Sequence, residues 1–232
     1  MLQIKRYFSS FIKYQPLLWE LVKRDLKVRY KHSILGLIWT VLNPLLMMIV
    51  LTIVFSNMFS IDISNFPVYV LIGNIVFNFN NESTNQGMNS LIWNGTLIKK
   101  VYIPKYLFPL ANILSCLVNF GFSFIALIIV MLITRTSFHP TIITAWLPLI
   151  YLITFSIGLS LILCSINVFF RDMQHLYSVI TTAWMYLSAI FYSIEIVPAY
   201  LRPFIELNPL YQYIKFFRQI IIEGVFPNIA TN

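Results

Sequence analysis

The chain has 232 residues, of which 59% are hydrophobic and only 10% are charged, and its mean hydropathy is +0.78. A soluble domain carries roughly a quarter to a third charged residues on its surface, so this composition excludes a cytosolic enzyme and indicates a membrane protein. Eight of the sixteen bases lie in the first 31 residues, ahead of the first long apolar run, and this asymmetry is typical of membrane orientation rather than of nucleic-acid binding.

Residues 1–31 form a charged leader whose second half has the pattern of an amphipathic helix. One face carries apolar side chains at four-residue spacing: Leu18, Val22, Leu26 and Tyr30. Another face carries bases at the same spacing: Lys23, Lys27 and Lys31. The spacing also predicts ion pairs four residues apart, Glu20–Arg24 and Asp25–Arg29. We predict an interfacial helix, although a plain topological anchor held by anionic lipid headgroups fits the same residues.

Five stretches with few charges predict five transmembrane helices, over about residues 34–59, 66–88, 106–134, 142–169 and 173–194. At 1.5 Å per residue each of them can cross a hydrocarbon core of ~30 Å. The second stretch is the most polar, because it contains several asparagines and continues through Glu82 and Gln86. Lipid offers amides no partners, so we expect its polar face to point into protein. The predicted fold is an all-α integral membrane protein with a transmembrane domain over residues 32–194.

Residues 195–232 differ in composition, since they hold four of the eleven prolines and three of the eight acids. Two short apolar pieces, 200–207 and 211–222, are interrupted by charges: Arg202, Glu206, Lys215 and Arg218. This pattern predicts short gate-like helices that lie in the membrane interface or dip into it. The whole segment is predicted to be external, proline-rich and re-entrant.

The distribution of bases predicts the orientation. Twelve of the sixteen bases fall in the leader, in the loop around residues 99–105 and at Arg171, against four on the other side of the predicted helices. Because positive charges accumulate on the cytoplasmic side, the N-terminus is predicted to be cytoplasmic. Five crossings then place residues 195–232 outside.

Four sequence blocks carry a family resemblance: RDLKVRYKHSILGLIWTVLNPLL (residues 24–46), LIKKVYIPKYLFPL (97–110), NVFFRDMQHL (167–176) and NPLYQYIKFFRQIIIEG (208–224). In this order they resemble the membrane subunits of type-two ABC exporters, the permeases of O-antigen, capsule and teichoic-acid export. The resemblance implies a multi-pass protein of the bacterial inner membrane that exports an undecaprenyl-linked glycan. It also implies a homodimer paired with two copies of a separate ATPase, which would bind the ATP and Mg, so no cofactor is expected in this chain.

The same resemblance assigns the second block to the cytoplasmic segment that docks into the ATPase. The candidate coupling residues are Lys99, Lys100, Val101, Tyr102, Ile103 and Lys105. Apolar anchors inside a charged rim suit a protein interface, while an internal loop with ordinary positive-inside charges is the alternative. Residues after 194 resemble the periplasmic gate helices of the family. Members normally have a sixth span after that segment, and its absence here predicts either a truncated or an atypical subunit.

Aromatic residues make up 16% of the chain and suggest a path for a polysaccharide. Their ring faces can stack on sugars while phenol groups form hydrogen bonds. The candidates for this path are Trp39, Tyr186 and Tyr192. The alternative is anchoring at the membrane interfaces, where tyrosine and tryptophan concentrate in any membrane protein.

The sequence has no G-x-x-x-x-G-K-[ST] motif, so energy must come from a partner or from a gradient. Acids are absent from the depth of four of the five predicted spans, which disfavours gradient coupling. A membrane enzyme acting on polyprenyl-phosphate-linked sugars is the alternative function, although Asp62, Glu195 and Glu206 fall on the opposite side from Asp25 and Asp172. The three histidines show no ligand spacing, so no metal site is predicted. A structural membrane scaffold also fits the residues.

Overall fold

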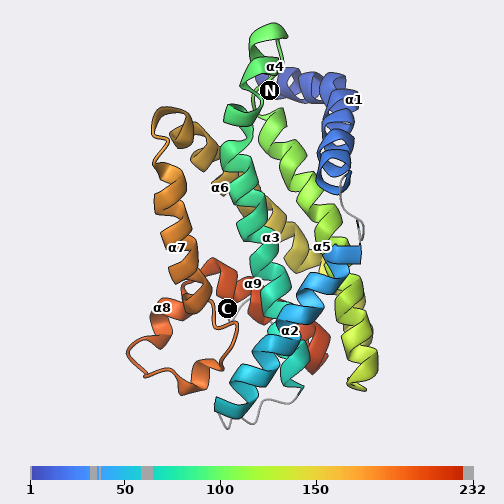
Figure 1. Ribbon diagram of the computed structural model, residues 1–232, viewed down its shortest axis with the longest axis vertical. Coiled ribbons are helices and arrows are strands. Elements are labelled where there is room, and N and C mark those ends of the chain that lie inside the picture. Colours follow the sequence, from blue (N-terminus) through green and yellow to red (C-terminus); the bar gives the residue numbers. More distant parts are fainter. Residues whose placement is uncertain (1, 32–35, 37, 59–64, 227–232) are drawn as a thin grey trace.

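The computed structural model describes residues 2–31, 36, 38–58 and 65–226, and within them it contains helices and no strand (Figure 1). The α-helices are α1 (Leu2–Tyr30), α2 (Ile38–Met58), α3 (Phe66–Trp93), α4 (Gly95–Lys100), α5 (Leu107–Ile133), α6 (Trp146–Phe169), α7 (Met173–Leu187), α8 (Arg202–Glu206) and α9 (Pro209–Arg218). Short 3-10 segments cover Pro140–Ala145 and Ile194–Ile196, and a π-helical turn, Gln219–Glu223, extends α9. The predicted all-α class is confirmed.

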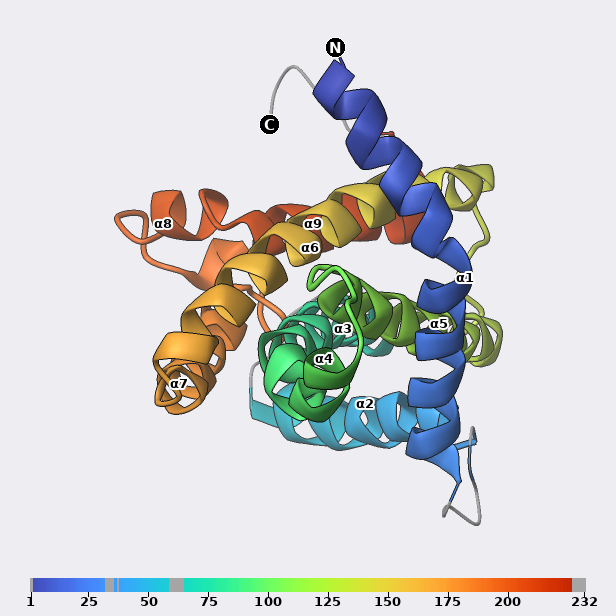
Figure 2. The same ribbon diagram turned by 90° about the horizontal axis from the view of Figure 1, so that it is seen from above.

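Helix α3 is the centre of the bundle. It contacts α2, α5, α6, α7 and α9, which surround it in both views (Figures 1 and 2). Its polar side chains bond to these neighbours: Asn80 accepts from Ser156 Oγ at 3.0 Å, and Thr84 pairs with the Tyr177 hydroxyl at 2.7 Å. The prediction that this polar stretch turns into protein is confirmed for these residues.

Small residues bring α3 and α6 close together. A Cβ built at Gly87 would lie 1.7 Å from Ser160 Oγ and 3.0 Å from Ser160 Cβ. Close backbone approach through glycine and serine is a common way for membrane helices to associate, because it increases van der Waals contact. The polar bonds and this glycine contact together fix the register of α3 against α6.

Within the described residues, three helical stretches are long and apolar enough to cross a membrane by length and composition: Ile38–Phe55, Leu107–Ile133 and Pro140–Phe169. Helix α5 matches the predicted bounds within one residue at each end. Helix α3 runs to Trp93, past the predicted end at residue 88, and its polar residues keep it out of this apolar set. Residues 32–35, 37 and 59–64, which include parts of the first predicted span and Asp62, lie outside the described residues.

The prediction of one helix over residues 173–194 is wrong. Helix α7 ends at Leu187, and Ala189 adopts a φ of 46°, which is outside the helical region for an L-residue. The 15 residues of α7 cover only about 22 Å. The chain then turns across the end of the bundle toward α8 and α9 (Figure 1).

Residues 211–222, which the sequence predicts to lie in the membrane interface or to dip into it, pack into the bundle. Helix α9 contacts both α3 and α6, and it buries Leu210, Ile214 and Phe217 in the main hydrophobic core. Asn208 begins the helix by accepting a hydrogen bond from the Leu210 N–H at 3.0 Å, and its amide donates to the Leu187 carbonyl. This contact ties the start of α9 to the end of α7.

Arg218, at the end of α9, is only 6% exposed. Its guanidinium donates to the backbone carbonyls of Tyr69, Ala189 and Ile190 at 3.0–3.3 Å. It also lies 3.3 Å from the centroid of the Tyr69 ring, where a cation is attracted to the aromatic face. A charge that predicted an interfacial helix is therefore held inside the protein by three carbonyls.

Candidate functional site

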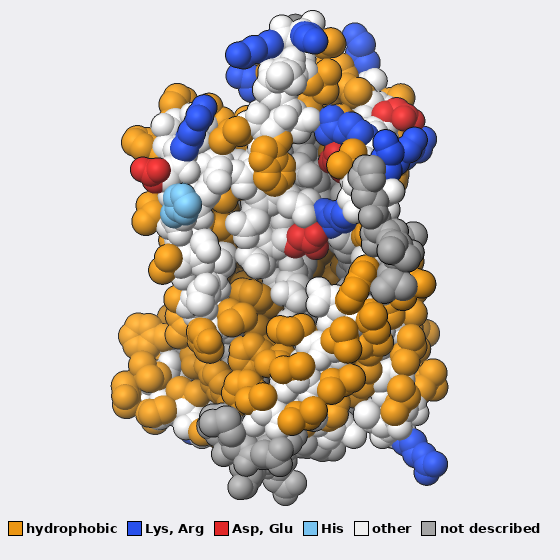
Figure 3. Space-filling view, in the orientation of Figure 1, with side chains coloured by type: hydrophobic (Ala, Val, Ile, Leu, Met, Phe, Trp, Pro, Cys, Tyr) orange, Lys and Arg blue, Asp and Glu red, His pale blue; other side chains and the backbone are white. Residues whose placement is uncertain are grey.

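The predicted coupling segment projects from one end of the bundle. It consists of α4 and the turn over residues 101–106, and α4 extends beyond the other helices (Figure 1). Basic side chains gather at this end of the molecule, while the opposite half is covered largely by hydrophobic ones (Figure 3). Tyr102 is 89% exposed, and the three predicted lysines, together with Val101, are exposed around it: Lys99, Lys100 and Lys105. The segment thus presents an aromatic ring inside a basic rim.

Ile103 does not belong to this exposed surface. It is 7% exposed and packs in a hydrophobic cluster with Leu18 and Val22 of α1 and with Leu107 and Phe108 of α5. The prediction that Ile103 is available as a docking anchor is wrong, because the protein's own leader helix already covers it. The same cluster joins α1 to the coupling segment, so two segments singled out in the sequence form one unit.

Helix α1 has the predicted amphipathic faces. Leu18 and Val22 are buried and Leu26 and Tyr30 are half-buried, whereas the bases of the other face are exposed: Lys23, Lys27 and Lys31. Its second half packs along α5 (Figures 1 and 2).

The predicted ion pairs four residues apart are wrong. Glu20 pairs with Lys23 at 2.8 Å, and Asp25 pairs with Arg24 at 2.8 Å. These shorter local contacts leave Arg29 to reach another helix.

The last turn of α1 is joined to α3 and α5 by a polar network. Arg29 forms an ion pair with Glu82 and donates to Gln86 Oε1 at 2.7 Å. The Tyr30 hydroxyl donates to Asn119 Oδ1, and the Asn119 amide donates to Glu82 at 3.3 Å. Burial lowers the pKa of Arg29, but the Glu82 carboxylate and neighbouring groups raise it, and the net shift is upward. Burial raises the pKa of the Tyr30 hydroxyl above its ordinary value of 10.0, so both groups keep their protons and continue to donate at neutral pH.

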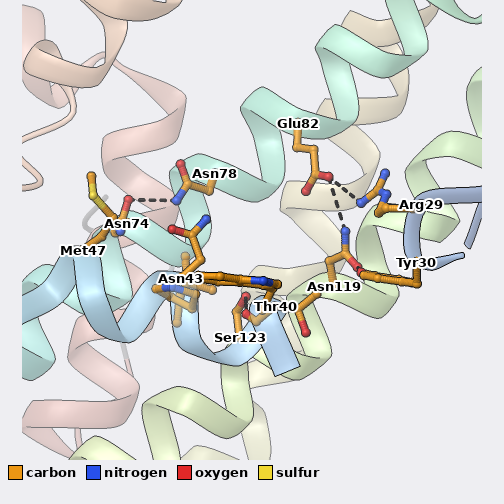
Figure 4. A pocket seen from close by; sticks show the side chains of 13 residues that line it. Arg29, Tyr30, Thr40, Asn43, Met47, Asn74, Asn78, Glu82, Asn119 and Ser123 are labelled. Atoms are coloured by element: carbon orange, nitrogen blue, oxygen red, sulfur yellow. Dashed lines mark hydrogen bonds and ion pairs between the residues drawn. The ribbon is translucent and has the colours of Figure 1, made fainter. Parts of the chain in front are cut away.

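Beside this network lies a pocket of about 520 Å³ between α1, α2, α3 and α5 (Figure 4). Most of the residues that line it have polar side chains, although they also present apolar surface: Arg29, Tyr30, Trp39, Thr40, Asn43, Pro44, Met47, Asn74, Ile75, Asn78, Glu82, Asn119 and Ser123. Helices α2 and α5 contribute lining residues from within their long apolar stretches. A volume of this size is in the range of ligand sites.

The three aromatic residues predicted to line a polysaccharide path do not lie together in the structure. Trp39 lines the pocket. Tyr186 and Tyr192 are not among the lining residues. Tyr186 is in the last turn of α7 and Tyr192 follows that helix, and the Tyr192 hydroxyl donates to the Tyr186 carbonyl at 2.6 Å.

Sequence reasoning missed Asn74, Asn78 and Asn119 as pocket residues. The signal was present, because Asn74, Asn78 and Glu82 recur every four residues on α3, and Asn119 and Ser123 have the same spacing on α5. These two polar stripes face one space only when α3 and α5 pack side by side.

Comparisons with known proteins identify the family of this chain. The family model described as ABC-2 type transporter matches residues 16–222. The O-antigen export system permease protein RfbA of Myxococcus xanthus is 30% identical over 229 residues, covering 96% of this chain and 86% of that protein. RfbA of Klebsiella pneumoniae is 31% identical over 88% of this chain and 79% of its own length, and the capsule polysaccharide export inner-membrane protein CtrC of Neisseria meningitidis is 22% identical over 91% and 81%. The chain belongs to the ABC-2 type transporter family, and it is a membrane transport component rather than a catalytic enzyme.

Proposed function

We propose that this chain is the permease subunit of an ATP-driven exporter that moves a lipid-linked surface polysaccharide across the bacterial inner membrane. The observation that carries the proposal is the unit formed by α1 and the coupling segment, which presents Tyr102 within exposed lysines in a chain without a phosphate-binding loop. The relatives named as O-antigen and capsule polysaccharide export proteins support the choice of cargo. An undecaprenyl carrier is the lipid that we expect.

The motor is a separate ATPase that binds ATP and Mg and docks on the exposed part of the coupling segment. Tyr102 supplies the apolar anchor, and Lys99, Lys100 and Lys105 form the rim. This division follows the usual anatomy of a protein interface, in which a buried aromatic residue contributes more than the solvated charges around it. Ile103 contributes indirectly, because it holds the turn against α1.

The topology that we propose has five crossings, with the N-terminus in the cytoplasm. The three apolar stretches supply three of them, and α3 and α7 supply the others. Helix α3 crosses because its polar residues face protein rather than lipid, and the short α7 is completed by the turn that leads toward α8. The bases gathered around α1 and α4 support a cytoplasmic location for that end.

Two copies of the chain form the transporter, together with two copies of the ATPase. Within the Ile38–Phe55 stretch of α2 only 6% of the residues are buried, and α7 exposes Leu176, Val179 and Ile180. These faces need either lipid or a second subunit as a neighbour. A pair of identical subunits with closed symmetry is the commonest solution for such an assembly.

The test is purification of the chain in detergent and identification of the ATPase that elutes with it, followed by export in cells that lack their own permease. We expect Lys99→Glu with Lys100→Glu to weaken both association and export. Arg135→Glu is the matched control, because that base lies at the end of α5 opposite the coupling segment. Full association after the double reversal would exclude the lysine rim from docking, and failure of any ATPase to co-elute would contradict the proposed function.

A further inference from the structure

The side chain of Glu82 joins three helices. Its Oε1 accepts hydrogen bonds from Arg29 of α1, from Gln86 of α3 at 3.0 Å and from Asn119 of α5 at 3.3 Å (Figure 4). Within the described residues 38–58 and 65–171, Glu82 is the one acidic side chain. The last turn of α1 is thus attached to the central helix α3 through this carboxylate and through the bond from Arg29 to Gln86.

Helix α1 does not need this ion pair to remain packed on the bundle. Leu18 and Val22 already pack in one apolar cluster with Leu107 and Phe108 of α5. An ion pair that is partly removed from water repays little more than its desolvation cost, so it is weak evidence for a role in stability. The role left for the pair is to fix the position of the last turn of α1.

Arg29 has a second acid within reach on its own helix. Asp25 lies four residues earlier, which is the spacing at which an acid and a following base pair on a helix surface. Asp25 is bonded to Arg24, but both of those bonds end on its Oδ1, at 2.8 and 3.0 Å, so its Oδ2 can accept from a second base. Arg29 can therefore exchange Glu82 for Asp25 without losing an acidic partner and without displacing Arg24.

The surroundings of the ion pair leave room for this exchange. The side chains of Arg29 and Glu82 are 23% and 36% exposed, and both line the pocket of about 520 Å³, so the guanidinium can move there without overpacking. After its release the Glu82 carboxylate keeps the Gln86 and Asn119 amides as donors. Because each exposed ion pair contributes little to stability, the two pairings of Arg29 differ little in free energy. A small input therefore shifts the balance between them.

We propose that Arg29 is a positioning residue that exchanges between Glu82 and Asp25. When it pairs with Glu82, the last turn of α1 is tied to α3; when it pairs with Asp25, that turn keeps its contacts with α5 and releases α3. The middle of α1 packs against Ile103, so the partner of Arg29 and the position of the coupling segment are linked. The use of this exchange in coupling ATP hydrolysis to export rests on the proposed function.

The test follows the last turn of α1 by fluorine NMR in lipid nanodiscs, with and without the ATPase. A trifluoroethylthio label is attached after Val28→Cys, at a position that is 69% exposed, in a background with Cys116→Ala and Cys164→Ala. Two signals report slow exchange and one averaged signal reports fast exchange, and both give the ratio of the released to the tied form. Asp25→Asn should lower this ratio about twofold or more, whereas Glu82→Gln should raise it about twofold or more.

Two isosteric substitutions of exposed acids are the matched controls. Glu20→Gln removes an acid of α1 that pairs with Lys23, and Asp172→Asn removes an acid at the start of α7. Both controls should leave the ratio unchanged. In cells lacking their own permease, Asp25→Asn and Glu82→Gln should each lower the amount of glycan exported per ATP hydrolysed by about twofold or more, while the ATPase still co-elutes with the chain.

Opposite shifts are the signature of the exchange, because a purely structural role of the two acids would move the signal in one direction. A signal that neither substitution changes, or a shift of the same sign in both, would overturn the proposal. If Glu82→Gln fails to fold, Asp25→Asn alone decides, since an unchanged ratio in that variant excludes Asp25 as a partner. The NMR result on the chain alone does not depend on transport. Opposite shifts in a chain that neither exports nor binds an ATPase would reject the proposed function, whereas restored export without them would reject the exchange.

Discussion

The buried Arg218 gives the sharpest test of how α9 is held in the bundle. We consider Arg218→Met, which keeps an aliphatic chain of similar length and removes the donors to the carbonyls of Tyr69, Ala189 and Ile190. Each carbonyl left buried without a donor costs about 1–3 kcal/mol, and the removal of a buried cation offsets part of that loss. We expect a net destabilisation of about 3–5 kcal/mol, within the range found when buried charge contacts are broken.

The measurement is the melting temperature of the purified protein in detergent, followed by size-exclusion chromatography. For a chain of this size about 1 kcal/mol corresponds to roughly 2–4 °C, so Arg218→Met should melt roughly 6–20 °C below the unaltered protein. Arg202→Met is the matched control, because Arg202 donates to the carbonyls of Val197 and Glu195 in an exposed part of the same segment, where water can replace it. Equal melting of the two variants would refute the claim that Arg218 fastens α9 to α3.

Three further predictions follow from the packing and the charges. Gly87→Ala should lower the free energy of unfolding by about 1–3 kcal/mol, because the added Cβ overpacks against Ser160. Adding Ser160→Gly should recover part of this loss. Gly158→Ala is the control, since no atom lies within 4 Å of the added Cβ, and it should leave the melting temperature unchanged. After removal of Cys116 and Cys164, cysteines at Ser137 and Ala199 should react with an impermeant thiol reagent in intact cells and those at Lys13 and Lys99 should not; labelling at Lys99 would contradict the proposed topology. Tyr102→Ala should abolish co-elution with the ATPase at unchanged melting temperature. Ile103→Ala should instead lower the melting temperature by roughly 4–16 °C, through loss of about 2–4 kcal/mol of core packing. Equal effects of the two substitutions would contradict the assignment of Tyr102 as exposed anchor and Ile103 as buried support.

Features encoded by local sequence were predictable. The uncharged run that became α5 was placed within one residue, because a long apolar stretch has no stable alternative to a membrane helix. The amphipathic stripe of α1 was also predictable, since Leu18 and Val22 are four residues apart and must share a face. The inward direction of the polar face of α3 followed from the lack of partners for amides in lipid.

Features set by distant partners were not predictable from one sequence. Arg218 resembled a charge in an interfacial helix, because hydropathy reports nothing of a carbonyl at Tyr69, 149 residues earlier in the chain. Arg29 was assigned to Asp25 on its own helix, yet it pairs with Glu82, 53 residues away. The end of α7 depends on the backbone of Ala189 and on the carbonyls that Arg218 holds, so an uninterrupted apolar composition overestimated the length of that helix.

The candidate coupling residues also combine a feature set by local sequence with one set by a distant partner. Tyr102 and Ile103 are neighbours in a turn and both are apolar, so composition alone gave them the same role. Their side chains point to opposite sides of the turn, one exposed and one packed against Leu18 and Val22. Which side faces a partner subunit depends on where α1 lies, and only the tertiary structure supplies that position.

Helix α1 connects the coupling segment with the pocket between α1, α2, α3 and α5. Its middle packs against Ile103 in the coupling segment, and its last turn holds the polar network of the pocket through Arg29 and Tyr30. Pro16 lies before this stretch, and residues 17–30 form an uninterrupted helical segment whose hydrogen-bonded backbone resists bending. We therefore expect a displacement of the coupling segment to move the last turn of α1 as well and to alter its contacts with Glu82 and Asn119. Because those residues also line the pocket, we expect force applied at the coupling segment to change the shape of the pocket without any contact between the two surfaces.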